Sequence, residues 1–291
     1  MAPIAVTHFT DPGCPWAYSA SPAHHVLRWR YGDQLRWRTV LIGLTESAEQ
    51  YVRRGYTPAG QAQGYRRFRR FGMPFSVTPR TQVVSTGRAC RAIVAASRWR
   101  PGSEEAALRA LQFAWFTTPL LLDRDEAIVA ALSAADDLDA EAILSLVGED
   151  GVEEDYQAGR AEARRAAGSP AALQGKTAQT DGPERYTAPT LIFENGGRTR
   201  LEGGGFQPVE AYDALVANLD AGLERRPPPA EPLPLLERFP AGLTSQEVAV
   251  LLVKSNDAPD RPAAEDALIA LVAAGRATRT ALGDDALWRA V

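Results

Sequence analysis

The sequence predicts an α/β fold with a large helical insertion and a small additional domain at the C-terminus. Three observations carry this prediction: a strand, helix, strand pattern near the N-terminus, a long Ala-rich stretch with helical periodicity, and a proline-rich string ahead of the C-terminal segment. The chain has 291 residues, of which 45 % are hydrophobic and 23 % are charged. This is the composition of an ordinary soluble globular protein, so collagen-like, disordered and membrane classes are excluded.

The N-terminal residues predict a βαβ unit. Ile4–Phe9 is a short β-prone run, and Pro15–Tyr31 has a helical pattern that Gly32 closes. Leu35–Ile42 then alternates between apolar and polar residues in LRWRTVLI, which is typical of a strand.

The middle of the chain is predicted to be helical before β-structure returns. From Thr45 to Gly168 the segments STGRACRAIVAASRW, EEAALRALQFAWF, DEAIVAALSAA and DAEAILSLV are Ala-rich and amphipathic. Pro189–Glu194, the turn pair Asn195-Gly196 and the run Arg198–Glu202 predict a β-hairpin. A helix from Pro208 to Leu223 is expected to cover this hairpin.

The string RRPPPAEPLPLLERFP at residues 225–240 holds six prolines, so we expect a stiff, extended linker without helix and a domain boundary. Beyond it, Thr244–Glu247 (TSQE) has the pattern of a capping box, and Ala263–Ala274 predicts a helix that Gly275 ends. The tail ATRTALGDDALWRA predicts a hairpin. Two helices and a hairpin over residues 241–291 resemble a winged-helix module.

Charge argues against a nucleic-acid partner. The net charge is −4, with 32 basic and 36 acidic residues, and residues 241–291 hold five basic against seven acidic residues. We therefore expect this module to serve packing or homodimer formation, and a DNA-reading regulator is the alternative. One cluster of basic residues is expected to form either a solvated helix face or a groove for an anionic ligand. It consists of Arg53, Arg54, Arg66, Arg67, Arg69 and Arg70.

Nothing in the sequence predicts export or membrane insertion. No Lys or Arg precedes Arg28, and no apolar run approaches the length of a membrane span. The expected location is therefore the cytoplasm, and no membrane partner is expected. Two cysteines are too few for a disulfide framework, so both are expected to be free in a reducing compartment.

The motif DPGCPWAY places Cys14 at a turn from strand to helix, with Pro15 as the first helical residue. Unpaired backbone N–H groups and the positive end of the helix dipole favour a thiolate there. We therefore expect a partly exposed, nucleophilic Cys14 whose pKa lies about one to three units below that of a free thiol. A buried, inert cysteine is the alternative reading. Cys90 lies in an amphipathic stretch and is expected to fill the core.

The motif resembles the active-site turn of the DsbA-like branch of the thioredoxin fold, and in particular the FrnE-like proteins, whose motif is Cys-Pro-Trp-Cys-Tyr. The resemblance covers most of residues 3–222 and includes RFGMPF at Arg70–Phe75, YTAPTLIFENG and GGFQP at Gly204–Pro208. It implies that Pro189 is a cis-proline that faces Cys14. The Ala188 backbone is then left to pair with an extended substrate or a thiol ligand.

The same resemblance implies a domain division. A thioredoxin-like domain is expected to consist of residues 1–44 and 169–224, with residues 45–168 as a helical insertion between its halves. The proline-rich linker then covers residues 225–240, and the winged-helix-like domain covers residues 241–291.

The sequence departs from the family motif at one decisive position. Ala17 stands where the family has its second cysteine, so no disulfide can form within the motif. The chemistry that remains is attack by Cys14 on a disulfide or an electrophile, with a low-molecular-weight thiol such as glutathione or mycothiol as co-substrate. Kappa-class glutathione transferases and 2-hydroxychromene-2-carboxylate isomerases use a single nucleophile at this turn. A degenerate binding protein and a redox-sensing regulator are the alternatives.

Further candidates surround the turn. Asp11 is expected to cap the helix or to tune Cys14 and relay protons, and Trp16 and Tyr18 are candidates for a substrate cleft. His8 is expected to be structural. With three His, two Cys and no CxxC motif, neither a metal site nor a tightly bound cofactor is expected.

Overall fold

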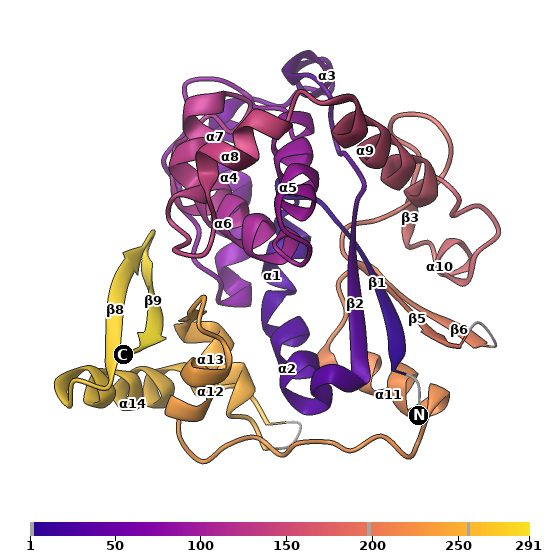
Figure 1. The fold of residues 1–291 in the computed structure, drawn as a ribbon. Helices are drawn as coiled ribbons and strands as arrows, with labels where there is room; N and C mark the ends of the chain where they lie inside the picture. Colours follow the sequence, from indigo (N-terminus) through magenta and orange to yellow (C-terminus); the bar gives the residue numbers. More distant parts are fainter. Residues whose placement is uncertain (1–2, 197–198, 255–256) are drawn as a thin grey trace.

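The computed structural model describes residues 3–196, 199–254 and 257–291. At its centre is a mixed sheet with the strand order β2-β1-β5-β6 (Figure 1). Strand β1 (Ile4–Thr10) pairs in parallel with β2 (Leu35–Leu41) and antiparallel with β5 (Thr190–Asn195). Strand β6 (Thr199–Gly204) pairs antiparallel with β5. The predicted βαβ unit and hairpin are confirmed, except that Arg198 lies outside the described residues.

The segment predicted as one N-terminal helix consists of two helices that meet at Ala20. Helix α1 covers Pro15–Ser19, helix α2 covers Ser21–Tyr31, and the short 3-10 helix η1 (Gly32–Gln34) follows. The break has a local cause, because Pro22 has no backbone N–H with which to continue the hydrogen-bond ladder of α1.

Helices cover both faces of the sheet. Helix α2 and helix α11 (Val209–Leu219) bury Leu27 and Tyr212 against β1 and β5. On the other face lie the end of α9 (Asp150–Ala163) and the short helix α10 (Pro170–Leu173). The turn between β1 and α1 is therefore held at the carboxyl end of an inner strand that helices cover on both faces.

The insertion between the two halves of the sheet is helical, as predicted. Its further elements are α3 (Ala48–Arg53), α4 (Pro58–Phe68), η2 (Arg69–Phe71), α5 (Gly87–Trp99), α6 (Glu104–Thr117), α7 (Asp125–Leu132) and α8 (Ala140–Leu146). Alanines on α5 and α6 let these helices approach closely around Ile93 and Leu111, which are fully buried. Two short strands, β3 (Thr177–Ala178) and β4 (Arg185–Tyr186), lead back to the sheet.

A small separate sheet forms at the C-terminus, with the order β7-β9-β8 and antiparallel pairing (Figure 1). The C-terminal domain that contains this sheet has the elements α12 (Leu233–Arg238), β7 (Leu243–Thr244), α13 (Ser245–Leu251), α14 (Arg261–Ala273), β8 (Ala277–Leu282) and β9 (Asp285–Ala290). The capping box predicted at Thr244 and Glu247 is present, with both of its reciprocal hydrogen bonds.

The expectation of a helix-free linker over residues 225–240 is wrong at α12. Pro232 is the N-cap of this helix and Pro234 lies in its first turn, where the missing N–H has no helical acceptor to lose. Leu235 and Leu236 are fully buried in the C-terminal core. Burial of these leucines therefore gives the segment a helix that its proline content argued against.

Glu247 joins the C-terminal domain to the rest of the protein. Its carboxylate is fully buried and accepts two hydrogen bonds from Arg109 of α6, at 2.8 and 2.7 Å. The Nδ1 atom of His25 lies 3.3 Å from Oε1 of the same carboxylate. Although burial alone raises its pKa, Arg109 and His25 hold the pKa of Glu247 well below its ordinary value.

No helix within residues 3–196, 199–254 and 257–291 is both long enough and apolar enough to cross a bilayer.

Candidate active site

Cys14 lies at the turn between β1 and α1 and faces the loop that leads into β5. It is the N-cap residue of α1, and Pro15 lies in the first turn, as predicted. The thiol donates a hydrogen bond to the carbonyl oxygen of Ala188, with Sγ and O 3.1 Å apart. The peptide bond between Ala188 and Pro189 is cis, the geometry that the family resemblance implied. Residues 174 positions apart therefore meet at the thiol.

The prediction of a partly exposed Cys14 with a lowered pKa is wrong. Only 6 % of the residue is exposed, and burial raises the pKa of the thiol to about 12. The backbone N–H of Ala17 favours the thiolate, but the nearby Asp11 carboxylate opposes it. Helix α1 has only five residues, so its partial charge does not offset the loss of water around the sulfur.

Asp11 organises the turn and does not cap α1. Its Oδ1 accepts a hydrogen bond from the backbone N–H of Gly13 at 2.9 Å. Its Oδ2 accepts hydrogen bonds from the N–H of Leu44 at 2.8 Å and from Thr86 Oγ1 at 3.1 Å. The residue is fully buried, and this burial raises the pKa of its carboxyl group. Asp11 therefore joins the Cys14 turn to the loop after β2 and to the start of α5.

Cys90 fills the core, as predicted. It is fully buried on α5, and its thiol is 3.6 Å from Oδ2 of Asp11, the hydrogen-bond acceptor. Both cysteines are free. Asp11 thus contacts the Cys14 turn through its Oδ1 atom and its backbone carbonyl, which accepts from the N–H of Cys14, and it contacts the thiol of Cys90 through Oδ2.

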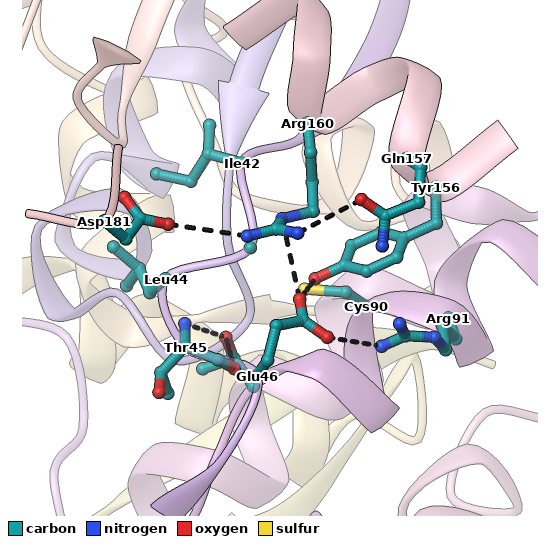
Figure 2. Close-up of polar contacts among 12 residues, drawn as sticks. Ile42, Leu44, Thr45, Glu46, Cys90, Arg91, Tyr156, Gln157, Arg160 and Asp181 are labelled. Carbon is teal, nitrogen blue, oxygen red and sulfur yellow. Dashed lines mark hydrogen bonds and ion pairs between the residues drawn. The ribbon is translucent and has the colours of Figure 1, made fainter. Parts of the chain in front are cut away.

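A polar network that the sequence did not predict fixes the loop after β2 (Figure 2). Glu46 accepts hydrogen bonds from the hydroxyl of Tyr156 and from Arg91, and Arg160 of α9 lies 3.5 Å from the same carboxylate. Arg160 also lies 3.5 Å from Asp181, which pairs with Arg164 as well. These contacts tie the insertion helices α5 and α9 to the residues that hold Asp11.

Two further residues near Cys14 were missed because they are remote in sequence. Arg185 on β4 is 4 % exposed and lies 3.5 Å from Asp181, and its positive charge favours the Cys14 thiolate. Tyr51 on α3 is nearly buried, and its pKa is raised by that burial and by the charges of Asp11 and Cys14. No motif marks either residue.

Trp16 is the exposed candidate beside the thiol. Its side chain is 40 % exposed, and its ring contacts the rings of Phe68, Phe71 and Phe206 at centroid distances of 4.8, 5.5 and 5.6 Å. Phe206 belongs to the GGFQP segment after β6. The structure therefore brings three distant aromatic residues to the Cys14 turn.

Tyr18 lies elsewhere. It is 1 % exposed, and its ring stacks on Phe116 inside the insertion core. This position does not fit the predicted place in a substrate cleft.

His8 is buried against His24, with ring centroids 4.7 Å apart, and desolvation lowers the pKa of His8 to about 3. In the part of the chain that the structure describes, no group of three His, Cys, Asp or Glu side chains is arranged to hold a metal.

Comparison with known proteins identifies the fold. No protein-family model and no curated protein matches the sequence. The structure is similar to that of the cytosolic disulfide reductase DsbM from Pseudomonas aeruginosa, with 18 % identity, a TM-score of 0.52 and coverage of 75 % of this chain and 100 % of DsbM. A structure of DsbM with GSH is also similar, at 19 % identity and a TM-score of 0.50, and covers 74 % of this chain and 98 % of that one.

A candidate DsbA oxidoreductase from Streptomyces coelicolor aligns at 16 % identity with a TM-score of 0.55, and covers 75 % of this chain and 91 % of its own. A candidate protein disulfide isomerase from Nitrosomonas europaea aligns at 18 % identity with the same TM-score, and covers 74 % and 97 %. At these identities the similarity shows the fold alone. The chain therefore has the DsbA-like thioredoxin fold, with a large helical insertion and a small C-terminal sheet domain.

Proposed function

We propose that this protein is a thiol–disulfide oxidoreductase or thiol transferase in which Cys14 is the single nucleophile and a low-molecular-weight thiol is the co-substrate. The observation that carries the proposal is the contact between the Cys14 thiol and the Ala188 carbonyl beside the cis-proline. In this fold, that arrangement sets a thiol against a backbone that an extended chain can pair with.

The chemistry has two steps. The Cys14 thiolate attacks one sulfur of a disulfide, which forms a mixed disulfide and releases the other half as a thiolate. A low-molecular-weight thiolate then attacks the substrate sulfur of the mixed disulfide, which joins this thiol to the substrate and releases the Cys14 thiolate. In the other order the thiolate attacks Sγ of Cys14 and releases the substrate thiolate, and a further exchange with a second thiolate releases Cys14 and the oxidised thiol. The similarity to DsbM, which has been solved with GSH, favours glutathione over mycothiol as this thiol.

The buried thiol needs activation by the substrate. At rest the S–H group donates to Ala188, and this hydrogen bond stabilises the neutral thiol. An extended substrate that donates its own N–H to the Ala188 carbonyl replaces the thiol as donor. The protonated form then loses its partner, while the positive charge of Arg185 continues to favour the thiolate.

A second thiol from this chain is not part of the proposal. Ala17 occupies the position of the resolving cysteine. Cys90 is fully buried and hydrogen-bonded to Asp11, so its use would require the α5 helix to move. The co-substrate thiol takes that role instead.

A degenerate binding protein is the second candidate. The observation in its favour is the burial of Cys14, which raises the pKa of the thiol to about 12. In that case the fold presents its surface around Trp16 to a partner, and Cys14 only packs.

For the C-terminal domain we propose a winged-helix architecture with a packing role. The order of helix, strand, two helices and hairpin from α12 to β9 supports the architecture. The exposed side of α14 carries Ala263, Asp266 and Ile269, and Arg261 pairs with Glu265 and Asp285. A helix with this surface lacks the cations that phosphate contacts need, which argues against a DNA-reading role.

Intact-mass measurement of the full chain in excess oxidised glutathione tests the proposed function. We expect one glutathione adduct in the wild type and in Cys90→Ala, and none in Cys14→Ser. Absence of any adduct from the wild type, with the protein folded, would favour the binding protein.

A further inference from the structure

The surface beside Cys14 combines aromatic rings with arginines. Trp16, Phe71 and Phe206 contact one another, and the guanidinium of Arg70 lies over the Phe71 ring at 4.7 Å from its centroid. Helix α4, which packs against α1, adds exposed arginines just before η2. We call the following six residues the basic–aromatic surface: Trp16, Arg66, Arg67, Arg70, Phe71 and Phe206.

Several arginines of the insertion have an acidic partner, whereas those of this surface do not, within the part of the chain that the structure describes. Arg88, Arg91 and Arg98 of α5 each pair with a carboxylate. Within residues 3–196, 199–254 and 257–291, no salt bridge or carboxylate hydrogen bond involves Arg66 or Arg67 or Arg70, whereas the neighbouring Arg69 pairs with Asp284. These three arginines therefore add unneutralised positive charge to the α4–η2 segment, whose Phe68 and Phe71 contact Trp16.

The segment around these arginines is rich in positive charge, although five of its arginines are paired with carboxylates of other segments: Arg69, Arg88, Arg91, Arg98 and Arg100. Between Glu49 and Glu104 the chain has eleven arginines and no Asp or Glu, although the whole protein is acidic with a net charge of −4. A positive region on an acidic protein attracts negatively charged partners and repels positive ones.

We propose that the substrate disulfide of Cys14 belongs to an acidic peptide segment, whose carboxylates bind Arg66, Arg67 and Arg70 while its apolar groups pack on Trp16. This inference rests on the proposed function and names the class of its substrate.

A peptide fits the spacing of the surface. Arg66 lies in the last turn of α4 and Arg70 in η2, and four residues at rises of about 1.5 to 2.0 Å each separate them by roughly 6 to 8 Å along the chain. In an extended peptide, side chains on the same face are also spaced by about 6.6 Å, because each residue rises about 3.3 Å. Acidic side chains at alternate positions of an extended peptide are therefore spaced to reach Arg66 and Arg70. The aromatic rings come from α1, η2 and the loop after β6, and so provide a broad surface rather than a closed small-molecule site.

The covalent step remains that of the proposed function. The Cys14 thiolate displaces one peptide thiolate from a symmetrical peptide disulfide and keeps the other peptide in a mixed disulfide. Because both halves of such a probe are identical, either sulfur gives the same product, and the rate reports recognition rather than the direction of attack.

The experiment measures the rate of adduct formation at Cys14 by intact mass. The probes are the disulfide dimers of acetyl-Xaa-Xaa-Cys-Xaa-Xaa-amide in which every Xaa is Glu, Gln or Lys. Each rate is divided by the rate of the same probe with 2-mercaptoethanol, which removes differences in intrinsic reactivity. We expect the Glu probe to react on the order of tenfold faster than the Lys probe, with the Gln probe between them, and this preference to shrink at high salt.

Two triple variants with the same change in net charge locate the effect. The variant R66Q/R67Q/R70Q is expected to lose most of the preference for the Glu probe. The control R36Q/R124Q/R276Q, in which three exposed arginines away from the aromatic cluster are replaced, is expected to retain it. Circular dichroism verifies that both variants fold.

Three outcomes overturn the inference. Equal normalised rates for the three probes, or equal losses in the two variants, would show that the arginines do not select the substrate, while the proposed function stands. A second outcome concerns small disulfides, with glutathione disulfide as the anionic probe and cystamine as the cationic probe. If glutathione disulfide is preferred over cystamine by more than the Glu probe is preferred over the Lys probe, and if this preference depends on the same arginines, the surface belongs to a small anionic thiol. No adduct with any probe would reject the proposed function itself and the inference with it.

Discussion

The carboxylate of Glu247 and the guanidinium of Arg109 form a two-bond ion pair between the C-terminal domain and the helical insertion. Glu247 is both the capping-box acid of α13 and the buried partner of α6. The same carboxylate also accepts a hydrogen bond from the hydroxyl of Ser21 on α2. One acid thus determines the start of a C-terminal helix and its position against two helices of the rest of the protein.

Replacement of Glu247 by Gln is expected to destabilise the protein by about 3–5 kcal/mol, because it leaves the buried Arg109 charge without its counterion. Urea unfolding at pH 7 measures the change, and limited proteolysis within residues 225–232 reports detachment of the C-terminal domain. Glu265→Gln, which breaks the exposed pair with Arg261, is the control and should cost less than about 1 kcal/mol. A Glu247→Gln protein with the urea midpoint of the wild type would contradict this role.

Cys14 in the free protein is expected to react slowly with iodoacetamide at neutral pH. Burial raises the pKa of its thiol to about 12, so the reaction rate should keep rising with pH well above pH 9. The rate of a free thiol, whose pKa is about 8.5, levels off in that range. Cys14→Ser identifies the part of the rate that belongs to this residue.

Arg185→Gln is expected to slow this reaction further, since it removes a positive charge that favours the thiolate. Arg36→Gln removes the same charge at an exposed site on β2 and should leave the profile unchanged. A midpoint at or below about 8.5 in the wild type would show that the thiol is exposed and activated without substrate.

Two buried histidines predict a loss of stability in acid. Desolvation lowers the pKa of His8 from 6.5 to about 3 and that of His24 in the same direction. The unfolded chain takes up protons below pH 6.5 while the folded protein does not, so stability is full above that pH and falls progressively towards pH 3.

Urea midpoints between pH 7 and pH 4 measure this slope. We expect His8→Phe to flatten it, because the variant has one fewer group that gains a proton on unfolding. Trp37→Phe, a change of a non-titrating ring in contact with both histidines, should keep the wild-type slope. If His8→Phe has the same slope as the wild type, His8 is not neutral in the folded protein at these pH values.

Local patterns were sufficient to predict the elements around Cys14 because strand alternation, Pro15 and the family motif all act over a few residues. The environment of the thiol was not predictable in the same way. Its burial depends on Ala188, which is 174 positions away, and Arg185 reaches it from a two-residue strand that no pattern marks. The helix at Leu235 was missed for a similar reason, since its stability comes from burial in a core formed by later residues.

Ala17 gives the sharpest test of the proposed single-cysteine chemistry. In a motif with two cysteines, the second thiol is held at a high effective concentration, so a mixed disulfide at the first collapses to an internal disulfide. Ala17 lies three residues after Cys14, about one helical turn away, in the same buried cluster. Ala17→Cys is therefore expected to show no lasting glutathione adduct, to lose two mass units on oxidation and to gain turnover in a dithiol reductase assay.

Ala20→Cys provides the matched control, because it also adds a buried thiol near α1 but six residues from Cys14. It should accumulate the glutathione adduct as the wild type does. An internal Cys14–Cys90 disulfide in the wild type would contradict the single-cysteine mechanism, since the resolving thiol would then reside on α5. Equal adduct accumulation in Ala17→Cys and the wild type would show that position 17 is not within reach of Cys14. A cysteine within reach must compete with glutathione for the mixed disulfide.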